Sequence, residues 1–295
     1  FIQKLPTSKI NHRNFLQLFP YAVEQFDLSD YDLVVSSSAS VAKGVLTNQD
    51  QLHICYCHTP MRYAWDLYFD YLKDKNLSFG IKSIYARKVL HKLRTWDLLS
   101  SNRVDFFVAN SEFIAKRIRK IYNREATVIY PPVDIEDFVL EKEKEEYYVT
   151  ASRLVSYKKI DIIVKAFNQM PHKILKVVGD GPDLKKIKNI SKGNIQILGS
   201  LEKKDLIKTI QKAKAFIYAA EEDFGILPVE AQSCGTPIIA YNKGGLKETV
   251  IDYLNCAHKD RKITIVEIDR FTGKGSGPGY SLMQCRKHLE LPFIF

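Results

Sequence analysis

The sequence predicts an α/β protein with two domains, each built around a parallel sheet. Short apolar runs rich in β-branched residues alternate along the chain with segments whose apolar residues recur at helical spacing. This alternation is typical of parallel sheets covered by helices. A charged stretch without an apolar pattern, residues 135–146, interrupts the alternation, so we place a linker between two domains there.

The first half of the chain contains strand patterns that each end in a turn signal. We expect strands at residues 31–40, 52–60, 104–111 and 126–134. Residues 81–101 carry apolar positions at near-helical spacing and predict a long helix. Asn110 and Ser111 are good N-cap residues for a second helix directly after the third strand.

The second half repeats the alternation of strands and helices. We expect strands at 147–154, 173–182, 195–200, 215–220 and 236–241, and helices at 158–170, 184–190, 203–213, 228–234 and from 245 onward. The pattern stops in a glycine-rich, irregular stretch. The expected organisation is a partial Rossmann-like domain at 1–138, a second Rossmann-like domain at 139–255 facing it across a cleft, and an irregular tail at 256–295.

Composition excludes several classes of protein. With 45% hydrophobic and 26% charged residues, the chain has the composition of a globular protein. It has no apolar run of about 18 residues, so we expect no membrane-spanning helix. Five cysteines at scattered positions argue against a disulfide framework and favour a reducing, cytoplasmic compartment. The formal net charge of +10 favours anionic partners.

Two short motifs could suggest a metal site, but neither is complete. The segment from Cys55 to His58 reads CYCH, and no second pair of ligands stands at a useful spacing. Asp30 and Asp32 form a DxD pattern, but they stand at the entry of an expected strand. Ligands of parallel sheets bind at the opposite end of the strands. We therefore predict no metal.

The carboxyl ends of the strands in the second half carry cations, acids and glycines. These positions hold Arg153, Lys158, Gly181, Glu221, Glu222, Gly225, Lys243 and Gly244. Arg153 can neutralise a pyrophosphate through its forked guanidinium, and Lys158 can do so as a point charge. The helix expected after Gly225 offers backbone N–H groups and a positive dipole end. This rim suits a nucleotide diphosphate.

Two glutamates flank the turn at Phe224 and Gly225. Glu222 lies in the loop directly after a strand, and Glu230 lies about one turn into the following helix. A carboxylate accepts two hydrogen bonds, so Glu230 suits the vicinal hydroxyls of a ribose and Glu222 suits a second polyol such as a sugar. Spacing alone also allows a helix-start charge and a solvated face. His58, at the end of a strand, could face the cleft or be structural.

Several segments resemble retaining glycosyltransferase family 4, of the GT-B fold. The stretch EEDFGILPVEAQSCGTPIIAYNKGGLKETV resembles the family signature of two glutamates, here Glu222 and Glu230, separated by seven residues around an F-G turn. ASRLVSYKKID is similar to the family's diphosphate clamp, here Arg153 and Lys158. VANSEFIAKRI, VIYPPVD, VVGDGP and ILGSL match in the expected order. CYCHTPMRYAWD is similar to mannosyltransferases of bacterial O-antigen assembly, and the resemblance spans residues 20–255.

The resemblance implies a role for each matching residue. Arg153 and Lys158 would hold the donor diphosphate, and Glu230 would bind the nucleotide ribose. Glu222 would touch the donor sugar, and His58 would stand beside the reacting carbon. The remaining donor contacts would be Leu201, bordering the base, and the backbone amides of Phe224, Gly225, Ile226 and Leu227.

The resemblance also implies a reaction. A hexose would move with retention of its anomeric configuration onto a lipid-linked glycan in O-antigen or other polysaccharide synthesis. Its donor would be a nucleotide sugar, expected to be GDP-mannose, and no metal or other cofactor would be needed. Alternatives are a GT-B nucleotide-sugar epimerase and an inactive nucleotide-binding remnant. The remnant is suggested because family members begin with a strand and glycine-rich loop that this chain lacks, and because the pattern is lost after Asn255. We therefore expect an incomplete N-terminal domain.

The long helix at 81–101 bears on the expected partners. Its polar face holds Lys82, Arg87, Lys88, Lys92 and Arg94. Such a basic face could rest on an anionic membrane or simply be solvated. We expect a cytoplasmic protein with peripheral contact to the inner face of the membrane. Nucleic acid is a poor partner because the aromatic residues do not interleave with the basic ones.

Overall fold

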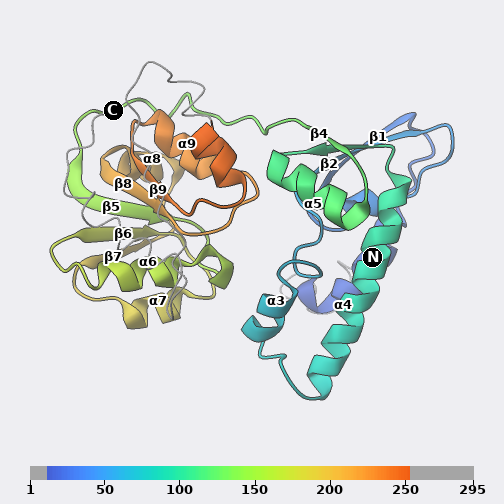
Figure 1. The fold of residues 1–295 in the computed structure, drawn as a ribbon, viewed down its shortest axis with the longest axis horizontal. Coiled ribbons are helices and arrows are strands. Elements are labelled where there is room, and N and C mark those ends of the chain that lie inside the picture. The colour runs from blue at the N-terminus through green and yellow to red at the C-terminus, as the bar shows by residue number, and fades with distance from the viewer. Residues whose placement is uncertain (1–11, 253–295) are drawn as a thin grey trace. The chain divides into compact units, whose positions relative to one another are not determined.

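The computed structural model describes residues 12–252 and divides the chain into two units, which meet between Pro131 and Pro132. Each unit has its own parallel sheet, so the expected α/β class with two Rossmann-like units is confirmed (Figure 1). Phe138, in the stretch expected to be a linker, is buried in the core of the second unit. The expected irregular tail at 256–295 lies outside the described residues.

The described part of unit 1, residues 12–131, contains four parallel strands in sequential order. They are β1 (Leu33–Ser38), β2 (Leu52–Cys57), β3 (Phe106–Ala109) and β4 (Ala126–Val128). Its helices are η2 (His12–Leu18), α2 (Phe19–Val23), η3 (Ala42–Gly44), α3 (Tyr68–Asp74), α4 (Ile81–Ser100), η4 (Ser101–Arg103) and α5 (Glu112–Tyr122). Ser111 caps α5 as expected, because its hydroxyl accepts a hydrogen bond from the Ile114 amide at 3.1 Å.

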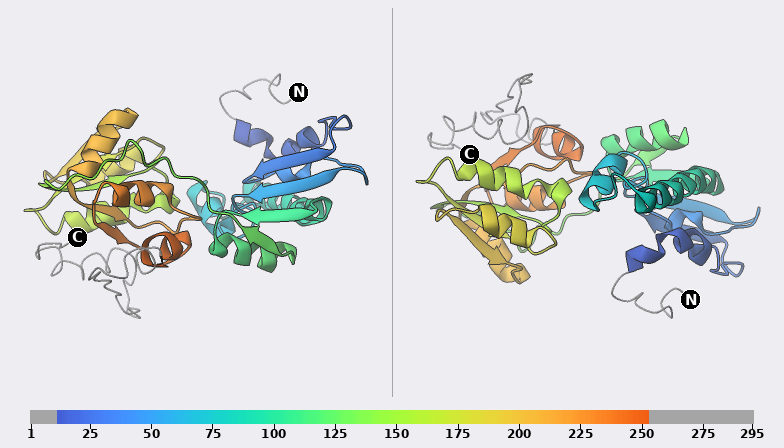
Figure 2. Two further views of the ribbon diagram at one scale, coloured as in Figure 1. Left: turned by 90° about the horizontal axis from the view of Figure 1, so that it is seen from above. Right: turned by 90° about the horizontal axis from the view of Figure 1, so that it is seen from below.

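One face of the unit 1 sheet carries no described helix. Right-handed crossovers made in one direction place every connection on the same side of a sheet, and the order β1-β2-β3-β4 has no reversal. Buried and exposed residues therefore alternate along β1 and β2. The register of the strands places Leu33, Val35, Leu52 and Phe106 together on the exposed side of the sheet. The left view of Figure 2 looks onto the sheet of unit 1.

Within residues 132–252, unit 2 contains five parallel strands in the order β7-β6-β5-β8-β9. They are β5 (Glu145–Ala151), β6 (Ile174–Val178), β7 (Ile195–Gly199), β8 (Ala213–Tyr218) and β9 (Ile238–Ala240). The helices are η5 (Ser156–Lys158), α6 (Ile160–Phe167), α7 (Leu184–Ile190), α8 (Lys203–Gln211), α9 (Ile226–Ser233) and the π-helix η6 (Lys247–Asp252).

The strand order of unit 2 reverses between β5 and β8, so helices cover both faces. On one face, Ile163 and Phe167 of α6 pack with Tyr148 of β5 in a continuous apolar core. On the other face, Ile210 of α8 and Ala231 of α9 pack with further strand residues. Parallel α/β sheets bind ligands at the carboxyl ends of strands beside such a reversal. The fold therefore points to the loops after β5 and β8.

Candidate functional site

The loop after β8 is joined to the loop after β9 through the backbone of Glu222. Glu222 forms an isolated parallel bridge with Gly244, and the Gly245 amide donates to the Glu222 carbonyl at 2.8 Å. Gly244 has a φ of +76°, and a Cβ there would lie 2.4 Å from the Glu222 carbonyl oxygen. The two loops meet because Gly244 has no side chain, and this contact fixes the position of Glu222.

Lys158 and Glu222, which are far apart in the sequence, are in direct contact. The Lys158 Nζ donates to a carboxylate oxygen of Glu222 and to the Tyr218 hydroxyl, the latter at 2.9 Å. The two side chains are only 15% and 18% exposed. Burial, and then the Glu222 carboxylate, raise the pKa of Tyr218, so its hydroxyl stays protonated. The structure thus brings together Lys158, which we expect to bind phosphate, and Glu222, which we expect to bind a sugar.

The other predicted donor-site residues of unit 2 follow neighbouring strands at the same edge of the sheet. Arg153 comes after β5 and is exposed, and Leu201 comes after β7 and packs partly against the core. Gly179 directly follows β6 with a φ of +129°, and a Cβ there would lie 1.9 Å from the Ser152 carbonyl oxygen. Glycine at 179 therefore lets the loops after β5 and β6 pack together.

The amino end of α9 stands directly after Glu222. Gly225 is its N-cap, with a φ of +95°, and no side chain caps the first turn. A Cβ on Gly225 would lie 2.6 Å from a methyl group of Leu246, so only glycine fits. Phe224 is buried, and Ile226 is 46% exposed. The helix begins at Ile226, two residues before the expected Pro228, so the first-turn amides and the helix dipole are available to an anion.

Glu230 has an environment unlike that of Glu222. It lies in the second turn of α9 and is partly buried. The pKa of its carboxyl is raised, mainly because the group is partly buried. The nearby Lys203 lowers this pKa, and Asp134 raises it further. Lys203 is itself paired with Asp134 at 3.1 Å and with Asp137 at 2.6 Å. Glu230 is therefore a carboxylate of unit 2 suited to accepting hydrogen bonds from neutral hydroxyl groups.

His58 belongs to unit 1, where it follows β2. Its amide donates to the Ser38 carbonyl at 2.8 Å, and its Nε2 lies 2.8 Å from the Ser37 hydroxyl. Its ring stands edge-on to Tyr56, with centroids 5.2 Å apart. The strand-end position expected from the sequence is confirmed, and the imidazole is oriented through one ring nitrogen.

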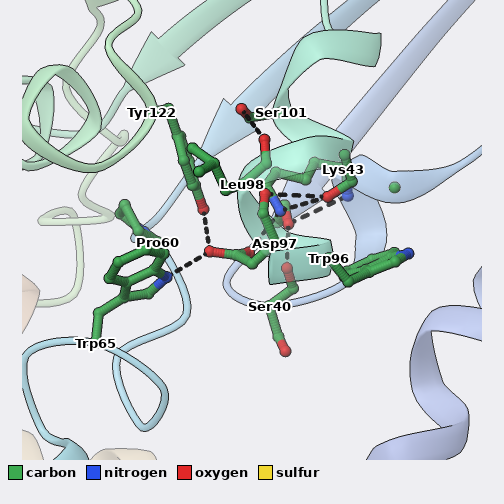
Figure 3. A network of polar contacts seen from close by, with 12 residues as sticks. Ser40, Lys43, Pro60, Trp65, Trp96, Asp97, Leu98, Ser101 and Tyr122 are labelled. Atoms are coloured by element: carbon green, nitrogen blue, oxygen red, sulfur yellow. Dashed lines mark hydrogen bonds and ion pairs between the residues drawn. The ribbon is translucent and has the colours of Figure 1, made fainter. Parts of the chain in front are cut away.

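A buried polar network, which the sequence analysis missed, supports the segment that begins at His58 (Figure 3). Asp97 of α4 accepts hydrogen bonds from Lys43 Nζ at 2.6 Å, Trp65 Nε1 at 2.7 Å and the Tyr122 hydroxyl at 2.9 Å. The Lys43 ammonium also lies 5.3 Å from the ring centroid of Trp96. Because Trp65 lies in the loop after His58, Asp97 fixes that loop to α4.

Two further contacts hold the same loop. Arg117 of α5 donates to the Thr59 hydroxyl at 2.8 Å and pairs with Asp66 at 3.2 Å. Arg94 of α4 donates to the Ala64 carbonyl at 2.9 Å. The only signal of this network in the sequence is the presence of polar residues at otherwise apolar helix positions, such as Asp97.

The CYCH and DxD motifs lie at opposite ends of the strands in unit 1. Cys55 and Cys57 are buried on the same face of β2, and Asp30 and Asp32 are exposed before β1. Within residues 12–252 no group of three or more His, Cys, Asp or Glu side chains is arranged to hold a metal ion. In the same part of the chain, no helix has the length and apolar composition to cross a bilayer.

Comparisons with known families agree with this architecture. Residues 2–137 match the model described as Glycosyltransferase Family 4, and residues 133–266 match the model described as Glycosyl transferases group 1. Together the two models account for residues 2–266. Sequence and fold therefore place the chain among the GT-B glycosyltransferases.

Curated relatives match parts of the chain. A GDP-mannose-dependent monoacylated alpha-(1-6)-phosphatidylinositol monomannoside mannosyltransferase of Corynebacterium glutamicum is 37% identical over 114 residues, covering 34% of this chain and 30% of the relative. The human alpha-1,3/1,6-mannosyltransferase is 22% identical over 261 residues, covering 75% and 59%. The chain spans 30% of the first of these relatives and 44% of an uncharacterized glycosyltransferase of Methanocaldococcus jannaschii.

Solved structures share the fold at low sequence identity. The HepE protein of Anabaena in complex with UDP-glucose aligns with a TM-score of 0.53 at 18% identity, covering 83% of this chain and 67% of that one. TarM aligns with a TM-score of 0.54 at 16% identity, covering 78% and 45%. These likenesses support the two-unit GT-B architecture.

Proposed function

We propose that the protein transfers a hexose from a nucleotide sugar onto a lipid-linked glycan, with retention of the anomeric configuration. The observation that carries the proposal is the contact between Lys158 and Glu222 beside the open amino end of α9. This edge of unit 2 combines a cation, a carboxylate and a helix start without a side-chain cap, which suits a diphosphate joined to a sugar. The names of the mannosyltransferase relatives favour GDP-mannose as the donor.

In the proposed reaction the protein mainly positions the donor and stabilises charge. Arg153, Lys158 and the first amides of α9 would bind the diphosphate, which becomes more negative as the anomeric carbon–oxygen bond breaks. Glu230 would accept hydrogen bonds from the ribose, and Leu201 would border the base. Phosphate would share the Lys158 ammonium with Glu222, so donor binding would rearrange this ion pair. Arg153, Lys158 and the positive end of the α9 dipole would supply positive charge at the leaving oxygen, and we propose that no cofactor is needed.

The transfer step would take place on one face of the sugar. The bond between the anomeric carbon and the phosphate oxygen breaks, and the acceptor oxygen forms the new bond on the same face. The acceptor proton passes to the leaving phosphate oxygen. Glu222 would orient the donor sugar, and His58 of unit 1 would contact it beside the reacting carbon. We further propose a cytoplasmic enzyme of O-antigen or related polysaccharide assembly.

Transfer from a radiolabelled donor tests this function directly. The chain would be incubated with GDP-mannose or UDP-glucose and a bacterial lipid extract, and label would be measured in the organic phase. We expect lipid-soluble label from GDP-mannose, an α-linked product by NMR, and loss of transfer in Glu222→Gln. Nucleotide binding without any transfer would instead support a nucleotide-binding remnant, and a changed sugar released without transfer would support an epimerase.

A further inference from the structure

The start of α4 forms an exposed apolar tip on unit 1. This apolar tip consists of Phe79, Ile81, Ile84 and Tyr85, of which Phe79 is 93% exposed and Ile81 is 87% exposed. Ile81, Ile84 and Tyr85 stand at helix spacings of three and four, so they share one face. Figure 1 shows this end of α4 at the turn from α3, at the end of the helix away from the sheet of unit 1. A cluster of this kind marks an interaction surface.

Basic side chains continue along the same face of α4. Lys88 and Lys92 follow Ile84 at successive intervals of four residues, and both are exposed. Each interval of four residues rises about 6 Å along a helix. The apolar residues therefore lie at the end of the helix, and the ammonium groups follow one and two turns behind them. Over residues 68–95 the chain has seven Lys and Arg against two Asp.

Two of the cations expected on a free basic face have structural partners instead. Arg87 donates to the Ser83 hydroxyl at 3.1 Å and to the Tyr68 hydroxyl at 3.3 Å. Arg94 donates to the Ala64 carbonyl at 2.9 Å. Arg87 and Arg94, two of the five basic residues on the expected polar face, are therefore engaged within unit 1. The exposed surface on this face of α4 therefore includes the apolar tip, followed by Lys88 and Lys92 one and two turns further along the helix.

We propose that this tip inserts into the headgroup region of an anionic bilayer. Aromatic and aliphatic side chains at a convex helix end can enter the boundary of the acyl chains, while lysines one and two turns behind reach lipid phosphates. The charge of the segment complements anionic lipid. The proposal deepens the proposed function, because it places unit 1 at the surface where a lipid-linked acceptor lies. Vesicle binding itself does not depend on catalysis.

Flotation with vesicles of defined composition tests the proposal. The full chain would be mixed at low salt with phosphatidylcholine vesicles that contain or lack phosphatidylglycerol. We expect binding only with phosphatidylglycerol, and a loss of at least tenfold in Phe79→Asp/Ile81→Asp. Replacing Lys88 or Lys92 by Gln should weaken binding about fivefold each. Unchanged binding by the tip variant, or no binding by the wild-type chain, would overturn the proposal.

A matched control separates the tip from other exposed apolar residues. Val35→Asp/Phe106→Asp places the same charges on the exposed sheet face of unit 1, and we expect it to bind vesicles like the wild type. Equal losses in both double variants would overturn the specific role of the tip. Nucleotide binding, measured on the same proteins, should stay intact in both. Its absence in the wild type would count against the proposed function and leave the vesicle result to stand alone.

Discussion

Asp97 is a buried carboxylate whose hydrogen bonds connect three parts of unit 1. It pairs with Lys43, and both side chains are almost fully buried, at 0% and 1% exposure. Removing one partner of such a pair leaves an unpaired buried charge and costs about 3–5 kcal/mol. Trp65 and Tyr122 complete the shell around the carboxylate. Asp97 is therefore a structural residue that also acts on the loop carrying His58.

We predict that Trp65→Phe and Tyr122→Phe destabilise the fold to a similar extent but differ in their effect on the loop after β2. Each removes one hydrogen bond to the same oxygen of Asp97, so each should destabilise the fold by about 1.5–3 kcal/mol. Only Trp65 belongs to the loop after β2, so only Trp65→Phe should speed amide hydrogen exchange at residues 58–66. Equal exchange in both variants at matched stability would contradict this role of Trp65.

At the scale of elements, the order of strands and helices could be predicted from local patterns. Every expected strand is present, and α7 has the expected bounds, because apolar periodicity and glycine turns are local signals. The helix α3 and the buried Phe138 were missed, since their segments are short and mostly charged or aromatic. The contact of Lys43 with Asp97 joins residues far apart in sequence, which no local pattern reveals.

Local sequence patterns also predicted which residues lie near the candidate site, but not the contacts between them. Strand ends placed Arg153, Lys158 and Glu222 at one edge of unit 2, because parallel strands share their carboxyl edge. The ion pair between Lys158 and Glu222 could not be predicted, because it depends on the loop contact at Gly244. Local spacing likewise cannot distinguish the partly buried setting of Glu230, where burial raises the carboxyl pKa, from a solvated face.

We predict that the backbone conformation at the start of α9 requires glycine at position 225. Gly225→Ala should lose about 1–3 kcal/mol of unfolding free energy, because its φ is positive and its Cβ would contact Leu246. Gly193→Ala is the matched control, since nothing lies within 4 Å of its added Cβ, and it should change stability by less than about 0.5 kcal/mol. Urea unfolding measures both, and an equal loss in the two variants would contradict the account.

At the scale of the whole molecule, the two units differ in how their sheets are covered. Reversal of strand order in unit 2 gives helices on both faces, whereas sequential order in unit 1 leaves an apolar face exposed. Val35 is 64% exposed and Phe106 is 62% exposed on that face. All-parallel sheets are normally covered on both sides. The exposed face is therefore the region of the described chain most prone to association.

We predict that the native chain binds a hydrophobic dye and self-associates through this face. Val35→Lys/Phe106→Lys should lower dye fluorescence and shift the protein toward the monomer in sedimentation, because charge is placed where apolar contact would occur. The control Ile226→Lys changes a single exposed apolar residue of unit 2 and should have little effect on association. If the wild-type chain is monomeric and does not bind the dye, this interpretation of the face is wrong.

Calorimetric titration of GDP, UDP and GDP-mannose into the purified chain tests the central claim, that unit 2 binds a nucleotide sugar. We predict that GDP binds more tightly than UDP, and that Arg153→Ala and Glu230→Ala each weaken GDP binding by about tenfold or more, as loss of charge-assisted hydrogen bonds requires. Glu221→Ala, which removes the ion pair of Glu221 with the exposed Lys243, should bind like the wild type. Absence of binding by all three ligands, or equal affinity in every variant, would contradict the account.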